Sequence, residues 1–483
     1  MSRAYRWACG VGVVEVGKAQ GLLWAIKEAA FRWFCNHSPK SLPLTFFDIR
    51  WLRTLPSTER LFFYETSSPN STISSFFFDS ILPRLKHSLS LTLLHFLPLA
   101  GNLTWPPTSP KPTVEYVESD GVSLAVAISN ADFHRLSDTD VFCEATEYHP
   151  MIPKLSASHD QIAVLAIQVT LFPNYGFSIG VTNHHAVLDG KSLISFVKSW
   201  AHICRSLESG HRDQSPSFLQ LPPELKPVYD RHYIKDPADL GTIFSNRWLN
   251  IDGPNNRNLG PLEVKIQSAD SVRGTFQLPR GKLEKLKQLA NKVIKQSGHH
   301  HIQVSTYSLT FAYTWICIAK AEEMSDEVLH FAVAMDFRSR LEPPLPATYV
   351  GNCVGVDIKV VDRETLLGKG GLLVALSAIS EIIKASEKGL LSGAENWVPS
   401  SADGVKTFSR LYSVVSSPRF EVYGTDFGWG RPRKVDVISI DKTGGISLSD
   451  NQNGDGGVEI GLVLRKHYME AFASLFAEGL ESL

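Results

Sequence analysis

The sequence predicts an α/β protein composed of two halves of similar size. From Leu42 onward, segments with the apolar or alternating character of strands interchange with segments of helical periodicity. Residues 208–262 are rich in Pro, Ser, Asn and Gly, a composition typical of a crossover between two domains. No fixed-period repeat is present, which excludes a solenoid.

In the first half, apolar spacing and turn residues predict helices and paired strands. Leu85, Leu89 and Leu93 recur at helical spacing within a helix expected over Leu82–Leu97. A Ser-Asp-Gly turn predicts a β-hairpin. The elements that complete this half are the hairpin strands Val114–Val117 and Val122–Val126, a strand pair over Ile162–Phe172 and Phe177–Val181, and an amphipathic helix over Ser192–Leu207.

The second half shows the same interchange of elements. Helices are expected over Lys282–Gln296, Ser305–Ala321, Leu372–Ser386 and His467–Leu480, and strands over Val328–Met335, Val354–Val361 and Val458–Leu464. We therefore predict a first domain over residues 37–207, a crossover over 208–262 and a second domain over 263–483.

Residues 1–36 differ from the rest of the chain and are interpreted as an N-terminal extension. Leu22, Leu23, Ile26 and Trp33 recur at helical spacing, which predicts a short amphipathic helix. Because its polar face is not strongly basic, a helix packed on the core or loosely attached is favoured over a membrane-surface anchor.

Composition excludes several classes of protein. Lys plus Arg is 48 and Asp plus Glu is 49, so the net charge of −1 argues against a nucleic-acid binder. The six Cys residues are scattered without a CxxC pair, which argues against a disulfide scaffold or zinc site and fits a reducing compartment. Neither a membrane-spanning stretch nor a signal peptide is visible. We therefore expect a cytoplasmic protein with no membrane or nucleic-acid partner.

The most informative pattern is H-x-x-x-D, which occurs at His134, His185 and His232. About one match is expected by chance, so context must distinguish them. Of the three, His185 alone follows a buried-type strand and precedes a helix, where a histidine can act as a general base. A histidine at the edge of the core, satisfied by a backbone carbonyl, fits the same position, and the residues alone leave both interpretations open.

A second pattern is Asp426-Phe427-Gly428-Trp429-Gly430. A given pentapeptide of this composition is expected in about one chain in ten thousand. Two glycines around a tryptophan indicate a tight, backbone-specific structure.

With these two patterns, the sequence resembles the BAHD acyltransferases of plants from Leu42 to its end. Further segments that carry the resemblance are Leu42–Asp48, Pro98–Leu103, Asp336–Arg340 and Tyr349–Cys353. The last is similar to the Y-F-G-N-C motif of the clade that acylates anthocyanins and related phenolic glucosides, with Val350 in place of Phe. Residues 1–36 do not match the family.

The resemblance implies two domains related to chloramphenicol acetyltransferase, with a channel between them. His185 is then the general base that activates an acceptor hydroxyl. Asp189 pairs with Arg338, or alternatively with Arg340, and supports the histidine loop. The resemblance also implies a structural role for the second pattern. Its members with that role are Asp426, Gly428 and Gly430.

The resemblance also implies acyl-CoA as co-substrate, with no bound cofactor, no metal and no covalent intermediate. Ser417 and Arg419 are candidate contacts for CoA, whose phosphates attract cations. Malonyl-CoA is the favoured donor, and the sugar of a flavonoid or other phenolic glucoside is the favoured acceptor. Lys191 is the candidate contact for the malonyl carboxylate. A hydroxycinnamoyl donor such as coumaroyl-CoA is the alternative, and a monomer is expected.

Three other classes of function were weighed against this one. A catalytically silent binding homologue conflicts with the intact His185 and Asp189. A serine hydrolase would depend on Ser178 in Gly-Phe-Ser-Ile-Gly, which lies inside an apolar strand-like run rather than a sharp turn. A metalloenzyme would depend on His184 together with His185 and Asp189.

Overall fold

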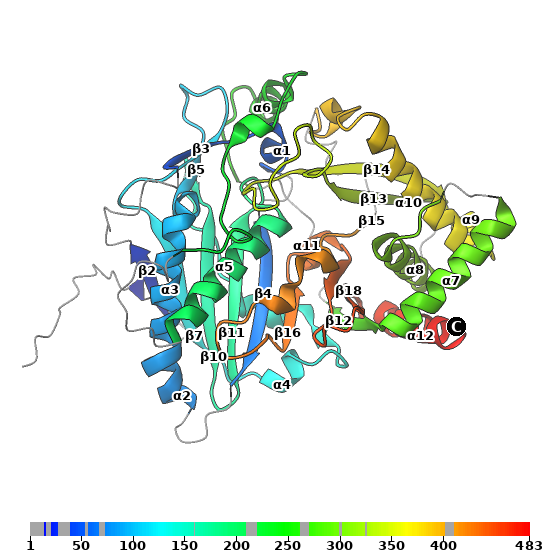
Figure 1. The fold of residues 1–483 in the computed structure, drawn as a ribbon, viewed down its shortest axis with the longest axis horizontal. Helices are drawn as coiled ribbons and strands as arrows, with labels where there is room; N and C mark the ends of the chain where they lie inside the picture. The colour runs from blue at the N-terminus through cyan, green and yellow to red at the C-terminus, as the bar shows by residue number, and fades with distance from the viewer. Residues whose placement is uncertain are drawn as a thin grey trace, which may run out of the picture.

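The computed structural model describes residues 14–15, 21–27, 39–53, 57–66, 73–158, 160–208, 220–260, 270–298, 302–323, 326–400 and 410–483. Two groups of strands and helices lie side by side, one formed mainly by the first 200 residues and one by the C-terminal part (Figure 1). This arrangement confirms the predicted α/β class.

The N-terminal half is organised around a sheet of seven described strands. Two of its inner strands, β10 and β11, are completely buried, and their residues are mostly apolar or small on both faces. The order is β1-β2-β7-β10-β11-β4-β16, with bounds Val14–Glu15, Gly21–Lys27, Gly121–Ile128, Leu165–Phe172, Gly176–His184, Ser57–Glu65 and Lys434–Val437. The strand pair predicted around residues 162–181 is therefore confirmed as the β10–β11 hairpin.

Two long helices cover one face of this sheet (Figure 1). They are α3 (Leu82–His95) and α5 (Gly190–Glu208), as the helical periodicity predicted. The indole of Trp200 on α5 donates to the carbonyl of Leu85 on α3, at 3.2 Å, and its ring is fully buried. The start of α5 is consequently held against the sheet, just beyond the end of β11.

The C-terminal half contains two further sheets and four long helices (Figure 1). Every helix and strand predicted here is present, with bounds shifted by a few residues at most. The strands are β12 (Ser271–Leu278), β13 (Val328–Asp336), β14 (Val354–Asp362), β15 (Leu411–Ser413), β17 (Ser447–Asp450) and β18 (Val458–Arg465). The helices are α7 (Arg280–Ser297), α8 (Thr306–Ala321), α10 (Gly371–Lys388) and α12 (Lys466–Glu481).

Each half also donates a strand to the other. β16 belongs to the C-terminal part of the chain but pairs with β4 in the N-terminal sheet. Conversely, β8 (Cys143–Glu144) pairs with β12 in the C-terminal sheet β17-β18-β12-β8. This exchange of β16 and β8 joins the two parts closely. The division into domains 37–207 and 263–483 stays a prediction.

The predicted hairpin around residues 114–126 is wrong, although its turn is present. The amide of Asp120 donates to the carbonyl of Val117 at 2.8 Å. β6 (Thr113–Glu115) then joins a small sheet, whereas β7 pairs with the buried strand β10. The turn residues therefore predict the turn correctly. The pairing of the two strands is determined instead by burial against distant parts of the chain. The other strands of that small sheet are β3 (Ser41–Pro43), β5 (Asn102–Thr104) and β9 (Gln161–Ala163).

Short helical segments complete the structure. They are α1 (Phe46–Ile49), α2 (Ile73–Phe76), α4 (Phe133–Leu136), α6 (Leu240–Asn250), α9 (Arg363–Leu367) and α11 (Ile440–Thr443). Within the described residues, none of the helices combines the length and the apolar character that crossing a bilayer requires.

The helix predicted within residues 1–36 is also wrong over its described part. Residues 21–27 form β2, which pairs antiparallel with β7 over its whole length. A short apolar run is compatible with helix or strand, and β7 offers a row of backbone donors and acceptors. The remainder of the predicted helix, residues 28–36, lies outside the described residues.

Deletion of residues 1–36 should therefore destabilise the protein, contrary to what an unattached extension would do. Loss of β2 leaves the edge of β7 unpaired, which lowers Tm and favours aggregation. A loss of 1 kcal/mol corresponds to about 2–4 °C in a domain of 150–250 residues. Thermal unfolding and soluble yield are the measurements, and deletion of residues 1–13, which keeps β2, is the control. Equal Tm and yield for both truncations would contradict the prediction.

Candidate active site

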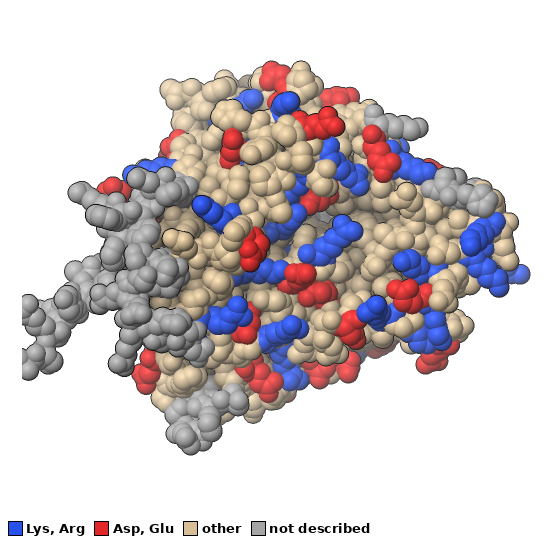
Figure 2. All heavy atoms as spheres, in the orientation of Figure 1, with Lys and Arg blue, Asp and Glu red and all other residues tan. Residues whose placement is uncertain are grey.

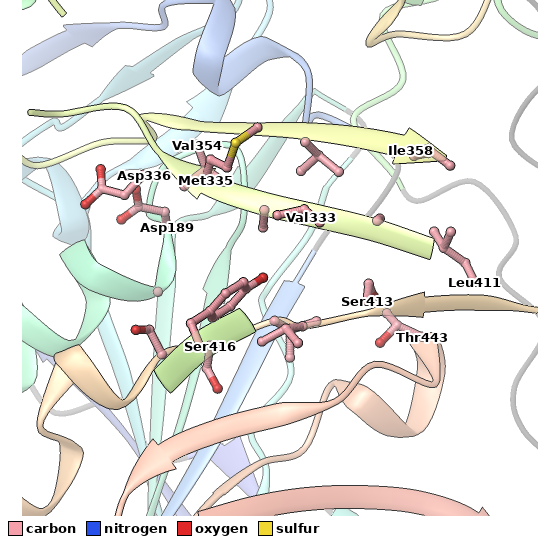
Figure 3. Close-up of a pocket in the computed structure, with 18 of the residues that line it drawn as sticks. Asp189, Val333, Met335, Asp336, Val354, Ile358, Leu411, Ser413, Ser416 and Thr443 are labelled. Carbon is pink, nitrogen blue, oxygen red and sulfur yellow. The ribbon is translucent and has the colours of Figure 1, made fainter. Parts of the chain in front are cut away.

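A cavity of about 2550 Å³ lies between the two halves of the molecule. Its lining includes Trp51 and His185 from the N-terminal half and residues of β13, β14 and β15 from the C-terminal half. Figure 3 shows Asp189 near one end, Val333 along one wall and Leu411 toward the other end. On the surface, Lys and Arg side chains are interspersed with acidic ones around a central hollow (Figure 2). The cavity is thus large enough for an extended ligand and has a mixed polar and apolar lining.

His185 lies in this cavity immediately after the end of β11. Its imidazole stacks on the indole of Trp51, with ring centres 4.2 Å apart and planes 9° from parallel. The Nδ1 atom is buried, although the residue itself is partly exposed and lines the cavity. Nε2 is therefore the ring nitrogen that can meet a substrate.

The electrostatic surroundings keep the imidazole of His185 neutral. Burial lowers its pKa below the ordinary value of 6.5, and the positive charge of Arg50 acts in the same direction. A contact with its own backbone, the charge of Asp189 and Asn352 oppose this effect without cancelling it. A neutral imidazole can accept a proton at physiological pH, as a general base must.

Asp189 forms a buried ion pair with Arg338. The separations are 2.8 Å from Nη1 to Oδ2 and 3.0 Å from Nη2 to Oδ1, which is the two-pronged geometry of strong carboxylate recognition. The amides of Ser192 and Cys353 also donate to this carboxylate, at 2.9 and 3.2 Å. Burial alone would raise the pKa of Asp189, but the charge and hydrogen bonds of Arg338 hold it below the ordinary value.

The structure thus contains the first of the two pairs considered from the sequence. Arg340, the alternative, donates instead to the hydroxyl of Ser386 on α10. Among the described residues, no hydrogen bond joins the carboxylate of Asp189 to the ring of His185. The oxygens of Asp189 are instead occupied by Arg338 and by the amides of Ser192 and Cys353.

Arg338 also joins three separate segments of the chain. Its Nη2 donates to the hydroxyl of Ser192 and to the carbonyl of Gly351, both at 3.0 Å. Its Nη1 lies 3.1 Å from Asp336, at the end of β13. The start of α5, the end of β13 and the segment Tyr349–Cys353 are therefore fixed by one guanidinium group.

Asn352 provides a second clamp on the catalytic loop. Its side-chain amide donates to the carbonyl of His185 at 2.8 Å and to Asp48 at 3.0 Å. Its backbone amide donates to the same Asp48 oxygen at 2.8 Å. The other oxygen of Asp48 accepts from the amide and hydroxyl of Thr45, at 2.9 and 2.7 Å. The backbone of His185 is thereby tied to α1.

The candidate ligand contacts all line the cavity, with different surroundings. The ammonium of Lys191 lies 3.2 Å from Asp336, so part of its charge is compensated within the protein. Ser417 and Arg419 belong to a short helical turn over Pro418–Phe420 that begins next to Ser417. Arg419 is exposed, as suits a contact with a ligand phosphate at the edge of the cavity.

The Asp426–Gly430 segment lies outside the cavity lining and is internally bonded. One oxygen of Asp426 accepts from the amides of Gly428 and Gly430, at 2.7 and 3.0 Å. Both glycines have positive φ, 104° and 93°, which L-residues with side chains rarely adopt. Phe427 is buried edge-on against Trp200, with ring centres 4.8 Å apart. These contacts fasten the C-terminal chain to α5.

The other sequence patterns that could indicate catalysis lie where they cannot take part in a reaction in the cavity. His134 and His232 do not line the cavity, and the side chain of His232 is 99% exposed. Ser178 is fully buried within β11, and it is a strand serine as its apolar neighbours predicted. Burial, together with the neighbouring His185, lowers the pKa of His184 to about 3.

The glycines on either side of Ser178 explain the false nucleophile motif. A Cβ atom on Gly176 would lie 2.1 Å from the carbonyl oxygen of Tyr64, and one on Gly180 would lie 2.1 Å from that of Met151. Both positions need glycine because other backbone approaches closely. For the metal alternative, the described residues include no group of three or more His, Cys, Asp and Glu placed to hold a metal ion.

Comparisons with known proteins agree with this geometry. The model of the Transferase family matches residues 36–478. The chain is 39% identical to phenolic glucoside malonyltransferase 1 of Arabidopsis thaliana over 460 residues, covering 92% of this chain and 94% of the relative. It is 40% identical to malonyl-CoA:anthocyanidin 5-O-glucoside-6''-O-malonyltransferase of the same plant, covering 91% and 95%. The chain belongs to the BAHD acyltransferase family. As a BAHD acyltransferase it takes its acyl group from an acyl-CoA.

Solved structures confirm the expected fold. The crystal structure of vinorine synthase, 21% identical, aligns with a TM-score of 0.61 over 96% of this chain and 98% of that protein. The crystal structure of F. sporotrichioides TRI101 complexed with coenzyme A and T-2, 16% identical, aligns with a TM-score of 0.60 over 90% of this chain and 97% of that protein.

Sequence reasoning missed several residues of this BAHD site. Asp48 and Asn352 were quoted only as members of motifs, and Trp51 and Arg50 were not singled out. The motifs that contain Asp48 and Asn352 drew attention to both residues. Their contact with each other, however, spans 304 residues of sequence. No local pattern reveals such a pair, because only the tertiary fold brings it together.

Replacement of Asp189 by Ala should lower the free energy of unfolding by about 3–5 kcal/mol, because Arg338 would remain buried without its main partner. Asp336→Ala removes another carboxylate from the same guanidinium, but this side chain is 43% exposed. Its loss should cost about 1 kcal/mol or less. Chemical denaturation of the two variants is the measurement. An Asp189→Ala protein of unchanged stability but no activity would instead assign direct chemistry to Asp189.

The acid limb of the pH profile should lie below the ordinary histidine pKa. Burial lowers the pKa of His185 below 6.5, so the neutral base is lost only as the pH falls through that lowered value. The quantity kcat/KM should therefore rise with pH below 6.5 and be flat at neutral pH, since it reports the free enzyme. A half-maximal rate above pH 7 would show that burial does not set the titration of the base.

Proposed function

We propose that this protein transfers a malonyl group from malonyl-CoA to a sugar hydroxyl of a phenolic glucoside, such as a flavonoid or anthocyanin glucoside. The observation that carries the proposal is His185, whose Nε2 edge faces a cavity large enough for both substrates. The names of the relatives supply the substrate classes, since malonyl transfer to phenolic and anthocyanin glucosides recurs among them.

His185 acts as general base in a direct transfer. Nε2 takes the proton of the acceptor hydroxyl while the oxygen attacks the thioester carbonyl carbon. The resulting tetrahedral intermediate collapses, the C–S bond breaks, and the imidazolium returns its proton to the CoA thiolate. An alcohol is a poor nucleophile at neutral pH, so a positioned base is required. Atoms and charges balance without a covalent enzyme intermediate.

The remaining site residues position the reaction. Asp189 and Arg338 fix the loop that presents His185, while the Asp426–Gly430 segment, with Asp426, Gly428 and Gly430, supports α5 from outside the cavity. Ser417 and Arg419 are proposed to contact CoA where the cavity reaches the surface. We also propose that the enzyme acts as a monomer in the cytoplasm, with no nucleic-acid or membrane partner.

A hydroxycinnamoyl donor is the second candidate. Agmatine coumaroyltransferase of Arabidopsis thaliana is 38% identical to this chain, covering 91% of it and 94% of the relative. The cavity wall contains Val333, Val354 and Ile358, an apolar surface on which an aromatic acyl group can gain by burial. Malonyl-CoA is favoured because most of the relatives named above are malonyltransferases.

A competition experiment tests the proposed function. Equal concentrations of malonyl-CoA and p-coumaroyl-CoA are offered with one phenolic glucoside, and the products are separated by mass spectrometry. Malonyl ester should dominate, and His185→Ala should lower kcat by about 10²–10⁴-fold or more without unfolding the protein. Preference for the coumaroyl donor would contradict the malonyl assignment, whereas full activity of His185→Ala would contradict the assigned base.

A further inference from the structure

One face of the sheet formed by β14, β13 and β15 is apolar and opens into the cavity. Val354, Val356 and Ile358 alternate along β14, so their side chains share this face, and all three line the cavity. Antiparallel pairing places Ala332 and Ala334 of β13, which also line the cavity, directly opposite Ile358 and Val356. Because alanine side chains are short, the branched side chains of β14 form the prominent apolar part of this wall.

The row of apolar side chains on β14 continues beyond the cavity. Val360 is the next residue on the same face, and Val360 and Ile358 are 56% and 39% exposed. The β14 strip is the set of alternate residues Val354, Val356, Ile358 and Val360. At about 3.3 Å per residue the strip is about 20 Å long. Apolar side chains that are exposed and contiguous mark a binding surface, whereas singly scattered ones do not.

The strip begins at the catalytic centre and ends at the surface. Val354 directly follows Cys353, whose amide donates to the carboxylate of Asp189 at 3.2 Å. Figure 3 shows Val354 near Asp189 and Ile358 at the other end of the view. A substrate whose reacting hydroxyl meets His185 can therefore extend along the strip toward solvent.

Charge distinguishes which of the two substrates suits the strip. CoA carries several phosphate groups, which need cations. No Lys or Arg of β13 or β14 lies on this face, because Lys359 alternates to the opposite one. The face carries instead two carboxylates near its ends, those of Asp336 and Asp362. An aromatic aglycone brings no negative charge and gains by burial against apolar side chains, so the strip suits the acceptor better than the donor.

We propose that the β14 strip binds the aglycone of the acceptor and makes the enzyme select glucosides of large aromatic aglycones over those of single phenols. The sugar lies next to His185, and the aglycone extends outward from Val354. This inference rests on the proposed function and names the surface that recognises its acceptor. The outermost ring carbons of a flavonoid are about 11 Å apart. The strip between Val354 and Ile358 is about 13 Å long and matches that length.

The test is a competition between a neutral flavonol glucoside and phenyl glucoside for malonyl-CoA. The ratio of the two malonyl esters, measured by mass spectrometry, does not depend on the fraction of enzyme that is folded. The wild-type enzyme should prefer the flavonol glucoside by about 10- to 100-fold, since burial of roughly 100 Å² more apolar area corresponds to that factor. The double variant Val356→Thr, Ile358→Thr should lower this preference by about 5- to 10-fold. Threonine keeps the branched shape and the strand propensity, so the sheet is retained.

Two controls accompany the double variant. Lys359→Thr changes a residue of the same strand next to Ile358 but on the opposite face, and it should leave the ratio unchanged. The KM of the double variant for malonyl-CoA, measured with phenyl glucoside as acceptor, should equal that of the wild-type enzyme.

Four outcomes would overturn the proposal. An unchanged ratio in the double variant would place the aglycone elsewhere, and a raised KM for malonyl-CoA in that variant would assign the strip to CoA. A wild-type dimer that Val360→Asp dissociates would assign the strip to a second copy of the chain. Equal use of the two glucosides by the wild-type enzyme would contradict this inference alone. Failure of the wild-type enzyme to malonylate either glucoside would instead contradict the proposed function itself.

Discussion

The buried ion pair between Asp189 and Arg338 is the interaction on which the geometry of the site depends. Removing two charges from water is costly, and the cost is met here by a two-pronged contact and by further hydrogen bonds of both partners. The amides of Ser192 and Cys353 donate to Asp189, and Arg338 donates to the hydroxyl of Ser192. Because the groups that contact the pair come from α5, the end of β13 and the Tyr349–Cys353 segment, the pair can form only when the two halves of the molecule are correctly assembled. A correctly placed His185 is therefore a consequence of the complete fold.

The exchange of strands between the halves gives the cavity fixed walls. β16 extends the N-terminal sheet, while β8 extends the C-terminal one. Arg273 on β12 is buried and lies 3.6 Å from Asp436 on β16, and it also contacts Asp441. Burial would lower the pKa of Arg273, but these two carboxylates raise it. The same device, a buried guanidinium between segments distant in sequence, thus appears both at the active site and at the seam between the halves.

Much of the architecture could be predicted because its long elements bury regular stripes. The helix at Leu82–His95 and the hairpin of β10 and β11 are examples, since period and turn residues agree there. The strand at residues 21–27 and the separation of β6 from β7 could not be predicted, because each depends on a partner strand elsewhere. At the site, its position after a strand made His185 a candidate, and the resemblance implied its role and those of Asp189 and Arg338. The clamp of Asn352 on His185 and Asp48, and the cation at Arg50, required the tertiary structure.

The charges around His185 bear on both halves of the proposed reaction. If His185 is the base, its lowered pKa makes the imidazole a poorer acceptor of the hydroxyl proton, which favours proton transfer concerted with attack on the thioester over a free alkoxide. The same lowered pKa makes the imidazolium a stronger acid toward the departing thiolate. Arg50 contributes to this lowering, and Asp189, already neutralised by Arg338, opposes it only partly.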